Sequence, residues 1–271
     1  MKTVAFTFCL LLLSSLSFAD ELPFKDGEIL NFDIRYKYGM VMVKAGSAQY
    51  RINSVTYDNQ PAYKTDVDFK TTSFFDKIFK VRDTLYSYTN NDADPMYSRR
   101  DIHEGSTTYR EEIYFKTFSS NFTEVRNVKS TDAGVKFDTI LVADMQGFDL
   151  LNIFTHMRKW NFSSIPMGDT RKIAIFTGKK RANVIVRFKG QTILGKSETL
   201  KYKTYKVELD IMDAAFSESK NAIEVWISDD KNHIPLKIKA KLKIGAVEID
   251  LANHRNIKYP LDSEVRIPIR K

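Results

Sequence analysis

Cysteine is almost absent from this sequence: Cys9 is the only one in 271 residues, and it lies in an apolar stretch near the N-terminus. Without that stretch, the chain can form no disulfide and has no thiol to bind a metal or to accept the acyl group of a lipoprotein. Stability must then come from a hydrophobic core, which a chain of this length can bury.

Long apolar runs are also scarce, and the longest near the N-terminus covers residues 4–13. It is too short to span a bilayer, which takes roughly 20 apolar residues. Lys2 before it and the small residues that end at Ala19 are typical of a secretory signal peptide. We expect cleavage after Ala19 and a periplasmic chain of residues 20–271 with no transmembrane segment, and an uncleaved anchor is the alternative.

Neither sign of charge is concentrated in one segment. The formal net charge is +8, but the 42 basic residues are interleaved with 34 acidic ones. Short basic runs such as residues 179–181 fall near expected turns and are typical of a solvated surface. We therefore expect no nucleic-acid partner, and the basic balance suits approach to an anionic membrane surface.

The common catalytic signatures are missing. There is no Gly-x-Ser-x-Gly elbow of a serine hydrolase and no glycine-rich phosphate-binding loop. No two histidines have metal-ligand spacing; they are His103, His156, His233 and His254. Asp229 and Asp230, close to His233, favour a polar turn over a cation site.

Two pairs of neighbouring acidic residues are candidates for acid–base chemistry. Successive side chains point to opposite faces of a strand, which argues against joint action of Glu111 and Glu112. Asp66 and Asp68 share a face, but Lys64 nearby favours a charged surface. We therefore expect no cofactor and no metal, and an enzyme acting on envelope glycans or lipids is the least favoured function.

Apolar and polar residues alternate along most of the chain. Leu30, Phe32 and Ile34 fall on one face of residues 29–38, with charged side chains on the other, as in a half-buried strand. Gly46, inside the next run, predicts a bulge or a close backbone approach. The expected strands cover residues 29–38, 41–52, 62–69, 84–89, 96–103, 107–118, 121–128, 135–142, 171–177, 182–188, 204–212, 222–227, 235–241 and 246–257.

The apolar period clearly changes between Asp144 and Trp160. Apolar residues there recur at steps of three and four, which predicts an amphipathic helix with Asp144 as its N-cap. The expected fold is mainly β: a long antiparallel meander curled into a barrel or a pair of half-barrels, with this helix packed across it. We expect residues 20–271 to form a single domain, and a division into two sub-sheets near residues 144–168 stays open.

The order of several short motifs resembles one family. They are Gly27-Glu28-Ile29-Leu30, Val43-Lys44-Ala45-Gly46-Ser47-Ala48, Met157-Arg158-Lys159-Trp160, Met167-Gly168-Asp169, Val225-Trp226-Ile227-Ser228-Asp229-Asp230, Ile234-Pro235-Leu236-Lys237-Ile238 and Lys243-Ile244-Gly245-Ala246-Val247-Glu248-Ile249. In this order they are similar to the exported bacterial domain-of-unknown-function family 3108. The resemblance implies an exported, sheet-dominated bacterial protein and brings no established activity.

A curled sheet with a helix across its mouth can enclose an apolar cavity, which we expect beneath residues 144–160. The favoured function is non-catalytic binding of a hydrophobic or amphiphilic envelope ligand, such as a lipid. The alternative is an envelope structural or interaction module that docks on a protein partner. The predicted ligand contacts are Phe148, Leu151, Phe154, Met157, Trp226 and Tyr36.

Overall fold

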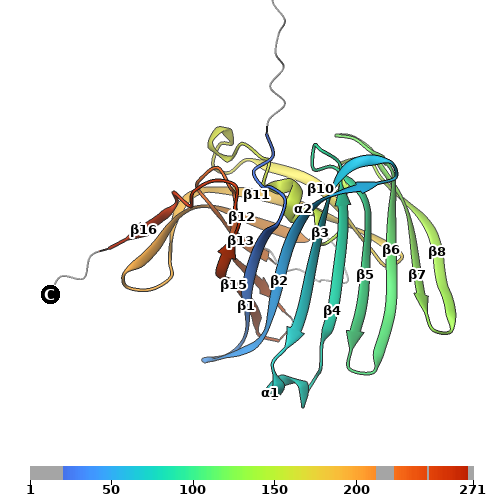
Figure 1. The fold of residues 1–271 in the computed structure, drawn as a ribbon, viewed down its shortest axis with the longest axis horizontal. Helices are drawn as coiled ribbons and strands as arrows, with labels where there is room; N and C mark the ends of the chain where they lie inside the picture. Colours follow the sequence, from blue (N-terminus) through green and yellow to red (C-terminus); the bar gives the residue numbers. More distant parts are fainter. Residues whose placement is uncertain (1–20, 212–222, 243, 268–271) are drawn as a thin grey trace, which may run out of the picture.

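The computed structural model describes residues 21–211, 223–242 and 244–267, and its strands form one sheet that curls into a nearly closed barrel (Figure 1). The mainly β barrel predicted from the sequence is thereby confirmed. The strands are β1 (Glu28–Tyr38), β2 (Val41–Tyr57), β3 (Gln60–Thr71), β4 (Arg82–Thr89), β5 (Pro95–Glu104), β6 (Thr107–Phe118), β7 (Thr123–Thr131), β8 (Gly134–Ala143), β9 (Gly147–Phe148), β10 (Thr170–Thr177), β11 (Lys180–Gly195), β12 (Leu200–Ile211), β13 (Ile223–Ser228), β14 (Pro235–Lys241), β15 (Ala246–Arg255) and β16 (Glu264–Arg266). The helical segments are α1 (Ser73–Asp76), α2 (Asn152–Met157) and the 3-10 turn η1 (Phe162–Ser164).

The sheet consists of two meanders joined edge to edge. Strands β1 to β8 pair in chain order, and so do β10 to β15. Antiparallel pairing of β1 with β15 joins the two meanders and places Ile34 opposite Ile249. The short β9 adds to β10 in parallel, and β16 pairs with the start of β12 outside the main strand order.

The bulge predicted at Gly46 is confirmed. Ile34 pairs with Gly46 while the next residue, Arg35, pairs with Lys44, so Ala45 is the extra residue. A Cβ on Gly46 would lie 2.5 Å from the carbonyl oxygen of Lys70 on β3. Glycine is therefore required here because β2 and β3 approach too closely for a side chain.

The long helix predicted between Asp144 and Trp160 is wrong in its extent. The segment contains β9 and the six-residue α2, η1 follows it, and the N-cap position of α2 is Leu151 and not Asp144. Gly147 belongs to a strand, packed where a Cβ would lie 2.3 Å from the ring of Phe176. The turn into α2 is instead fixed by Asp149, whose Oδ1 accepts hydrogen bonds from the next backbone amides, including that of Asn152 at 2.9 Å.

This segment closes the upper end of the barrel in Figure 1, and we call residues 144–168 the plug. Its apolar side chains form a core with the inner face of β10 to β13. The buried members of that core are Phe148, Ile153, Met157, Trp160, Phe162, Ile173, Ile175, Val184, Val186, Phe188, Tyr205, Val207, Leu209, Val225 and Ile227. A second core, beside the N-terminal residues Leu22 and Phe24, fills the space between the plug and β1 to β3.

The barrel closes between β6–β8 and β9–β10, a junction that we call the seam. Side chains bridge it in the described part of the chain, where no strand ladder links β8 to β10. The Gly147 amide donates to Thr123 Oγ1 at 2.8 Å, and Asn127 Nδ2 donates to the Gly178 carbonyl at 2.6 Å. The Gly178 amide donates to Glu111 Oε1 at 2.7 Å. Glu111 is thus buried inside the barrel, facing away from Glu112 as the sequence predicts.

Candidate functional site

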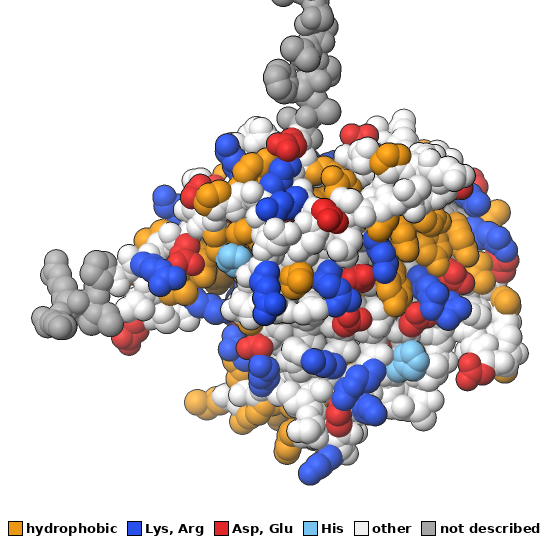
Figure 2. Space-filling view, in the orientation of Figure 1, with side chains coloured by type: hydrophobic (Ala, Val, Ile, Leu, Met, Phe, Trp, Pro, Cys, Tyr) orange, Lys and Arg blue, Asp and Glu red, His pale blue; other side chains and the backbone are white. Residues whose placement is uncertain are grey.

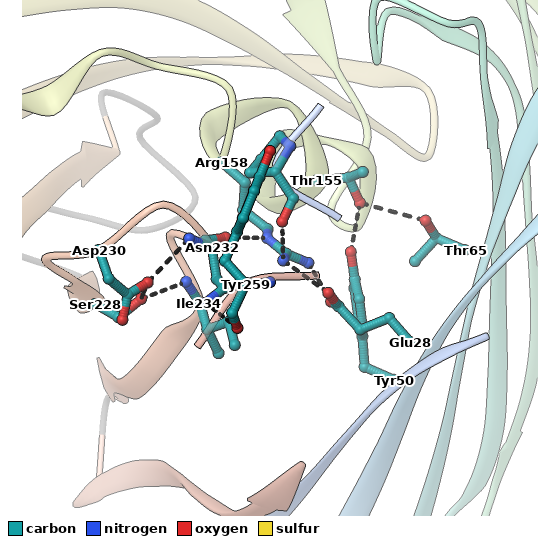
Figure 3. Close-up of polar contacts among 11 residues, drawn as sticks. Glu28, Tyr50, Thr65, Thr155, Arg158, Ser228, Asp230, Asn232, Ile234 and Tyr259 are labelled. Carbon is teal, nitrogen blue, oxygen red and sulfur yellow. Dashed lines mark hydrogen bonds and ion pairs between the residues drawn. The ribbon is translucent and has the colours of Figure 1, made fainter. Parts of the chain in front are cut away.

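A buried ion pair fixes the plug to the first strand. Arg158, directly after α2, is 1% exposed, and its Nη1 and Nη2 lie 2.5 and 3.0 Å from the two carboxylate oxygens of Glu28 on β1 (Figure 3). Its Nε donates to the Asn232 carbonyl at 3.1 Å. Burial lowers the pKa of Arg158, but the charge and hydrogen bonds of Glu28 outweigh burial and leave the pKa raised. The guanidinium is therefore a permanent cation inside the protein.

A hydroxyl network makes a second attachment. Thr155 on α2 lies with its Oγ1 2.9 Å from the Tyr50 hydroxyl on β2 and 3.4 Å from Thr65 Oγ1 on β3 (Figure 3). Burial raises the pKa of Tyr50, so the phenol stays neutral at physiological pH. Two strands of the first meander, β2 and β3, thus hold α2 by hydrogen bonds that leave none of these three hydroxyls without a partner.

The turn predicted at Asp229 to Asn232 is confirmed. Asp230 Oδ1 accepts from the Asn232 amide at 2.9 Å and from Ser228 Oγ at 3.0 Å. Asn232 Nδ2 in turn donates to the carbonyl of Tyr259 at 3.0 Å (Figure 3) and to that of Pro260, also at 3.0 Å. These contacts give the polar groups of the turn hydrogen-bond partners and tie the turn to the C-terminal segment. They therefore have a structural role at the plugged end of the barrel.

The opposite end, which carries α1, holds a cavity of about 340 Å³ on the inner face of β1 to β6. Its wall is mostly apolar, and the polar side chains on it come from β3, β4 and β5. The lining residues are Ile34, Ala45, Gly46, Phe69, Lys70, Thr71, Val81, Asp83, Leu85, Arg100, Ile102, Glu104 and Tyr109. This is at the small end of the volume range of ligand pockets.

Two carboxyl groups meet in this wall. Asp83 is 8% exposed, and its Oδ1 accepts the His103 amide at 2.8 Å. Burial raises the pKa of the half-buried Glu104, and the charge and hydrogen bond of Asp83 raise it further. Glu104 therefore keeps its proton to a higher pH than an ordinary glutamate, and its carboxyl group can then donate a hydrogen bond.

Arg100 connects the cavity with the seam. Its Nη2 lies 2.6 Å from Glu111 Oε2 and 3.1 Å from Thr177 Oγ1 on β10. Burial raises the pKa of Glu111, but the charge of Arg100 and hydrogen bonds from Asn127 and Gly178 outweigh it, and the pKa is lowered. Glu111 is thus an anion that balances Arg100, and the barrel wall beside the cavity depends on this pair.

Four of the six predicted ligand contacts belong to the plug. Phe148 and Met157 are 0% and 1% exposed in the core under the plug, and the partly buried Phe154 packs against the same core. Leu151 lies in the second core, beside β1 to β3. The structure therefore packs Phe148, Met157 and Phe154 closely together, and none of these three lines the cavity beside α1.

The other two lie elsewhere. Trp226 is half-buried on the face of β13 opposite its core neighbours Val225 and Ile227, and the Lys206 ammonium lies 5.1 Å from its ring centroid. Tyr36 donates its hydroxyl to the Ile244 carbonyl at 3.1 Å. Neither lines the cavity beside α1, and the role of all six as ligand contacts stays a prediction.

Asp66 and Asp68, the two acidic residues that share a strand face, form salt bridges. Arg51 on β2 bridges Asp66 and Asp68, with nitrogen–oxygen distances of 2.8 and 2.6 Å, and Lys64 lies 2.9 Å from Asp66. In the described residues, no three His, Asp or Glu side chains are grouped to hold a metal ion. None of the described helices has the length and apolarity to cross a bilayer.

Comparisons with known proteins agree with this architecture. A family model described as "Protein of unknown function (DUF3108)" matches residues 31–252. A beta-barrel-like protein of domain of unknown function DUF1849 from Brucella abortus has a similar crystal structure, with a TM-score of 0.56 and 10% identity over 87% of this chain and 100% of that one. At that identity the likeness concerns the fold alone. A search of curated proteins found no match.

Proposed function

The chain belongs to the DUF3108 family of proteins of unknown function, and we propose that it binds an apolar or amphiphilic small molecule inside its barrel. The observation that carries this proposal is the mostly apolar cavity on the inner face of β1 to β6. We also propose that it acts in the periplasm, as the signal peptide predicted to end at Ala19 implies.

The shape of the interior supports binding at this end of the barrel. The plug fills the opposite end with packed side chains, whereas Ile34, Leu85 and Ile102 face space beside α1. Apolar wall exposed to water is unfavourable by about 25 cal/mol for each Å². A ligand that covers this wall would recover that free energy, which favours a hydrocarbon chain or ring system as the part bound there.

The polar groups of the wall suit a ligand with one polar end. Asp83 and Glu104 supply a carboxyl pair, and Thr71 adds a hydroxyl. The raised pKa of Glu104 lets the pair donate or accept a hydrogen bond. An alcohol, amide or amine at one end of an apolar molecule would satisfy these groups, and a few such convergent polar groups are typical of sites that orient small ligands.

Filling the cavity tests the proposal. Leu85→Trp adds a large ring to the wall on β4, and Ile140→Trp adds the same ring at an exposed position on β8. The purified proteins are compared by native mass spectrometry after isolation from the envelope fraction and by titration with a fluorescent fatty acid. Ligand mass and probe binding should fall for Leu85→Trp and persist for Ile140→Trp.

Two results would refute binding in this cavity. One is equal probe affinity in both variants and in the wild type. The other is a clean unliganded mass for the wild type together with no uptake of the probe or of envelope lipids. Thermal unfolding of each variant checks that Leu85→Trp still folds, and Leu85→Phe is a milder replacement if it does not.

A further inference from the structure

Exposed apolar side chains gather at the end of the barrel that carries α1. Among the described residues, ten of the seventeen exposed large hydrophobic residues lie in or directly beside three turns at this end. We call them the apolar rim: Tyr38, Met40, Val41, Met42 and Val43 at the turn end of the β1–β2 hairpin, Phe74, Ile78 and Phe79 around α1, and Leu242 and Ile244 of the β14–β15 turn. A group of this size on one face marks an interaction surface.

The three turns are neighbours in space. β1 pairs Lys37 with Ala246, which in turn pairs with Lys241, so the β1–β2 and β14–β15 turns lie side by side. On the other side, the Thr72 amide before α1 donates to the Ala45 carbonyl of β2 at 2.9 Å. The rim is therefore one continuous edge of the barrel, and Figure 2 shows hydrophobic and basic side chains together at the lower end of the molecule.

The rim is convex. Met40 is fully exposed at the tip of the β1–β2 hairpin, and Phe74 and Ile78 are 65% and 69% exposed. These side chains stand on three separate turns of the chain. They suit a fluid apolar phase, into which each can insert independently.

The charges around the rim indicate which class of partner it binds. Residues 37–44, 72–82 and 241–245 contain one acidic residue, Asp76, which is paired with Arg82 at 2.6 Å. Lys77, Lys80 and Lys241 are exposed and form no ion pair with any described residue. Lysine is depleted in protein–protein interfaces, whereas lysines beside apolar and aromatic side chains are typical of proteins that bind anionic bilayers.

We propose that the apolar rim docks this end of the barrel on an anionic lipid bilayer. Met40, Phe74 and Ile78 enter the interfacial region, and the lysines contact the lipid phosphates. The cavity lies at the same end of the barrel, between β1 and β6, so docking would bring it close to the lipid. The docking depends on the rim and on the lysines beside it, and it does not rest on ligand binding in the cavity.

Vesicle sedimentation of the purified protein tests the proposal. The vesicles contain phosphatidylcholine alone or phosphatidylcholine with phosphatidylglycerol. The wild type should bind the anionic vesicles, and binding should weaken as salt is raised. The triple variant Met40→Ser, Phe74→Ser, Ile78→Ser should lose affinity by about a hundredfold or more, because three apolar side chains no longer enter the bilayer. Replacing Lys77 by Glu should cost roughly fivefold or more.

A matched control removes equally exposed apolar side chains away from the rim. Ile140, Met167 and Ile193 are 65%, 79% and 58% exposed, and their triple Ser variant should bind like the wild type. Absence of wild-type binding, or equal loss in the two triple variants, would overturn the proposal. The proposal would also be overturned if a protein partner could be cross-linked to the rim while the wild-type protein showed no affinity for vesicles. Leu85→Trp should still bind vesicles, so failure of docking and failure of ligand uptake are separately visible.

Discussion

Replacing Glu28 by Gln should destabilise the protein more than other single charge removals. The variant keeps the size of the side chain but removes the counter-charge from Arg158, a guanidinium that is 1% exposed. A cation left unpaired in the interior is expected to cost about 3–5 kcal/mol. The carbonyls of Asn232 and Pro23, at 3.1 and 3.4 Å, offset only part of this cost, because they carry no net charge.

The assay is thermal unfolding followed by circular dichroism. For a chain of this size each kcal/mol lowers Tm by roughly 2–4 °C, so Glu28→Gln should lower Tm by about 10 °C. Asp138→Asn is the matched control, since it removes the partner of Arg126 from a pair 2.5 Å apart whose side chains are 50% and 43% exposed. Solvent screens that pair, and Tm should change little.

A second variant separates the charge from the packing. Combining Glu28→Gln with Arg158→Met removes the buried cation and keeps an apolar chain beside Phe24, so most of the lost stability should return. The reasoning fails if Glu28→Gln lowers Tm no more than Asp138→Asn does. It fails equally if the double variant is less stable than Glu28→Gln alone.

Three further predictions concern the wall, the seam and the plug. Protonated Glu104 contributes stability that is fully present below the ordinary glutamate pKa and is lost as pH rises through the raised pKa of Glu104. Glu104→Gln should therefore raise Tm at neutral pH, and this gain in Tm should vanish in acid. The pKa of Glu111 is lowered, so Glu111 contributes stability that is present above the ordinary glutamate pKa and is lost as pH falls through the lowered pKa. Glu111→Gln should therefore flatten the acid side of the curve of Tm against pH. Gly147→Ala forces a methyl group against Phe176 and should cost about 1–3 kcal/mol in denaturant unfolding, whereas an unchanged midpoint would contradict that packing.

Period-two alternation predicted most of the barrel because it reports which face of each strand is buried. In β1 the alternation gives Leu30 and Phe32 to the core, as observed. The plug was harder to predict, because steps of three and four describe an apolar face without showing how long the helix is. Gly147 was the available signal, since glycine inside a helix is unfavourable and often marks a close backbone approach.

The carboxyl pair in the cavity was not predicted, because the ends of two strands were misplaced. The expected strands began at Thr84 and stopped at His103, so Asp83 and Glu104 each fell one residue outside. Parity with Leu85 and Ile102 would have turned both carboxyls inward had the strands been extended. Which two inward carboxyls meet depends on the register between β4 and β5, and a single sequence does not specify it.

The pairing of β1 with β15 imposes an order on biogenesis. Residues 246–255 are the partners of β1, so during synthesis one edge of β1 has no partner until these residues have been made. An unpaired edge strand is a template for aggregation, and contacts between distant parts of a chain form slowly. Asp33, Arg35 and Lys37 alternate along β1 and oppose intermolecular pairing during this interval. A chain that stops before residue 246 keeps the edge open permanently, so it should accumulate as an aggregate or be degraded by proteases.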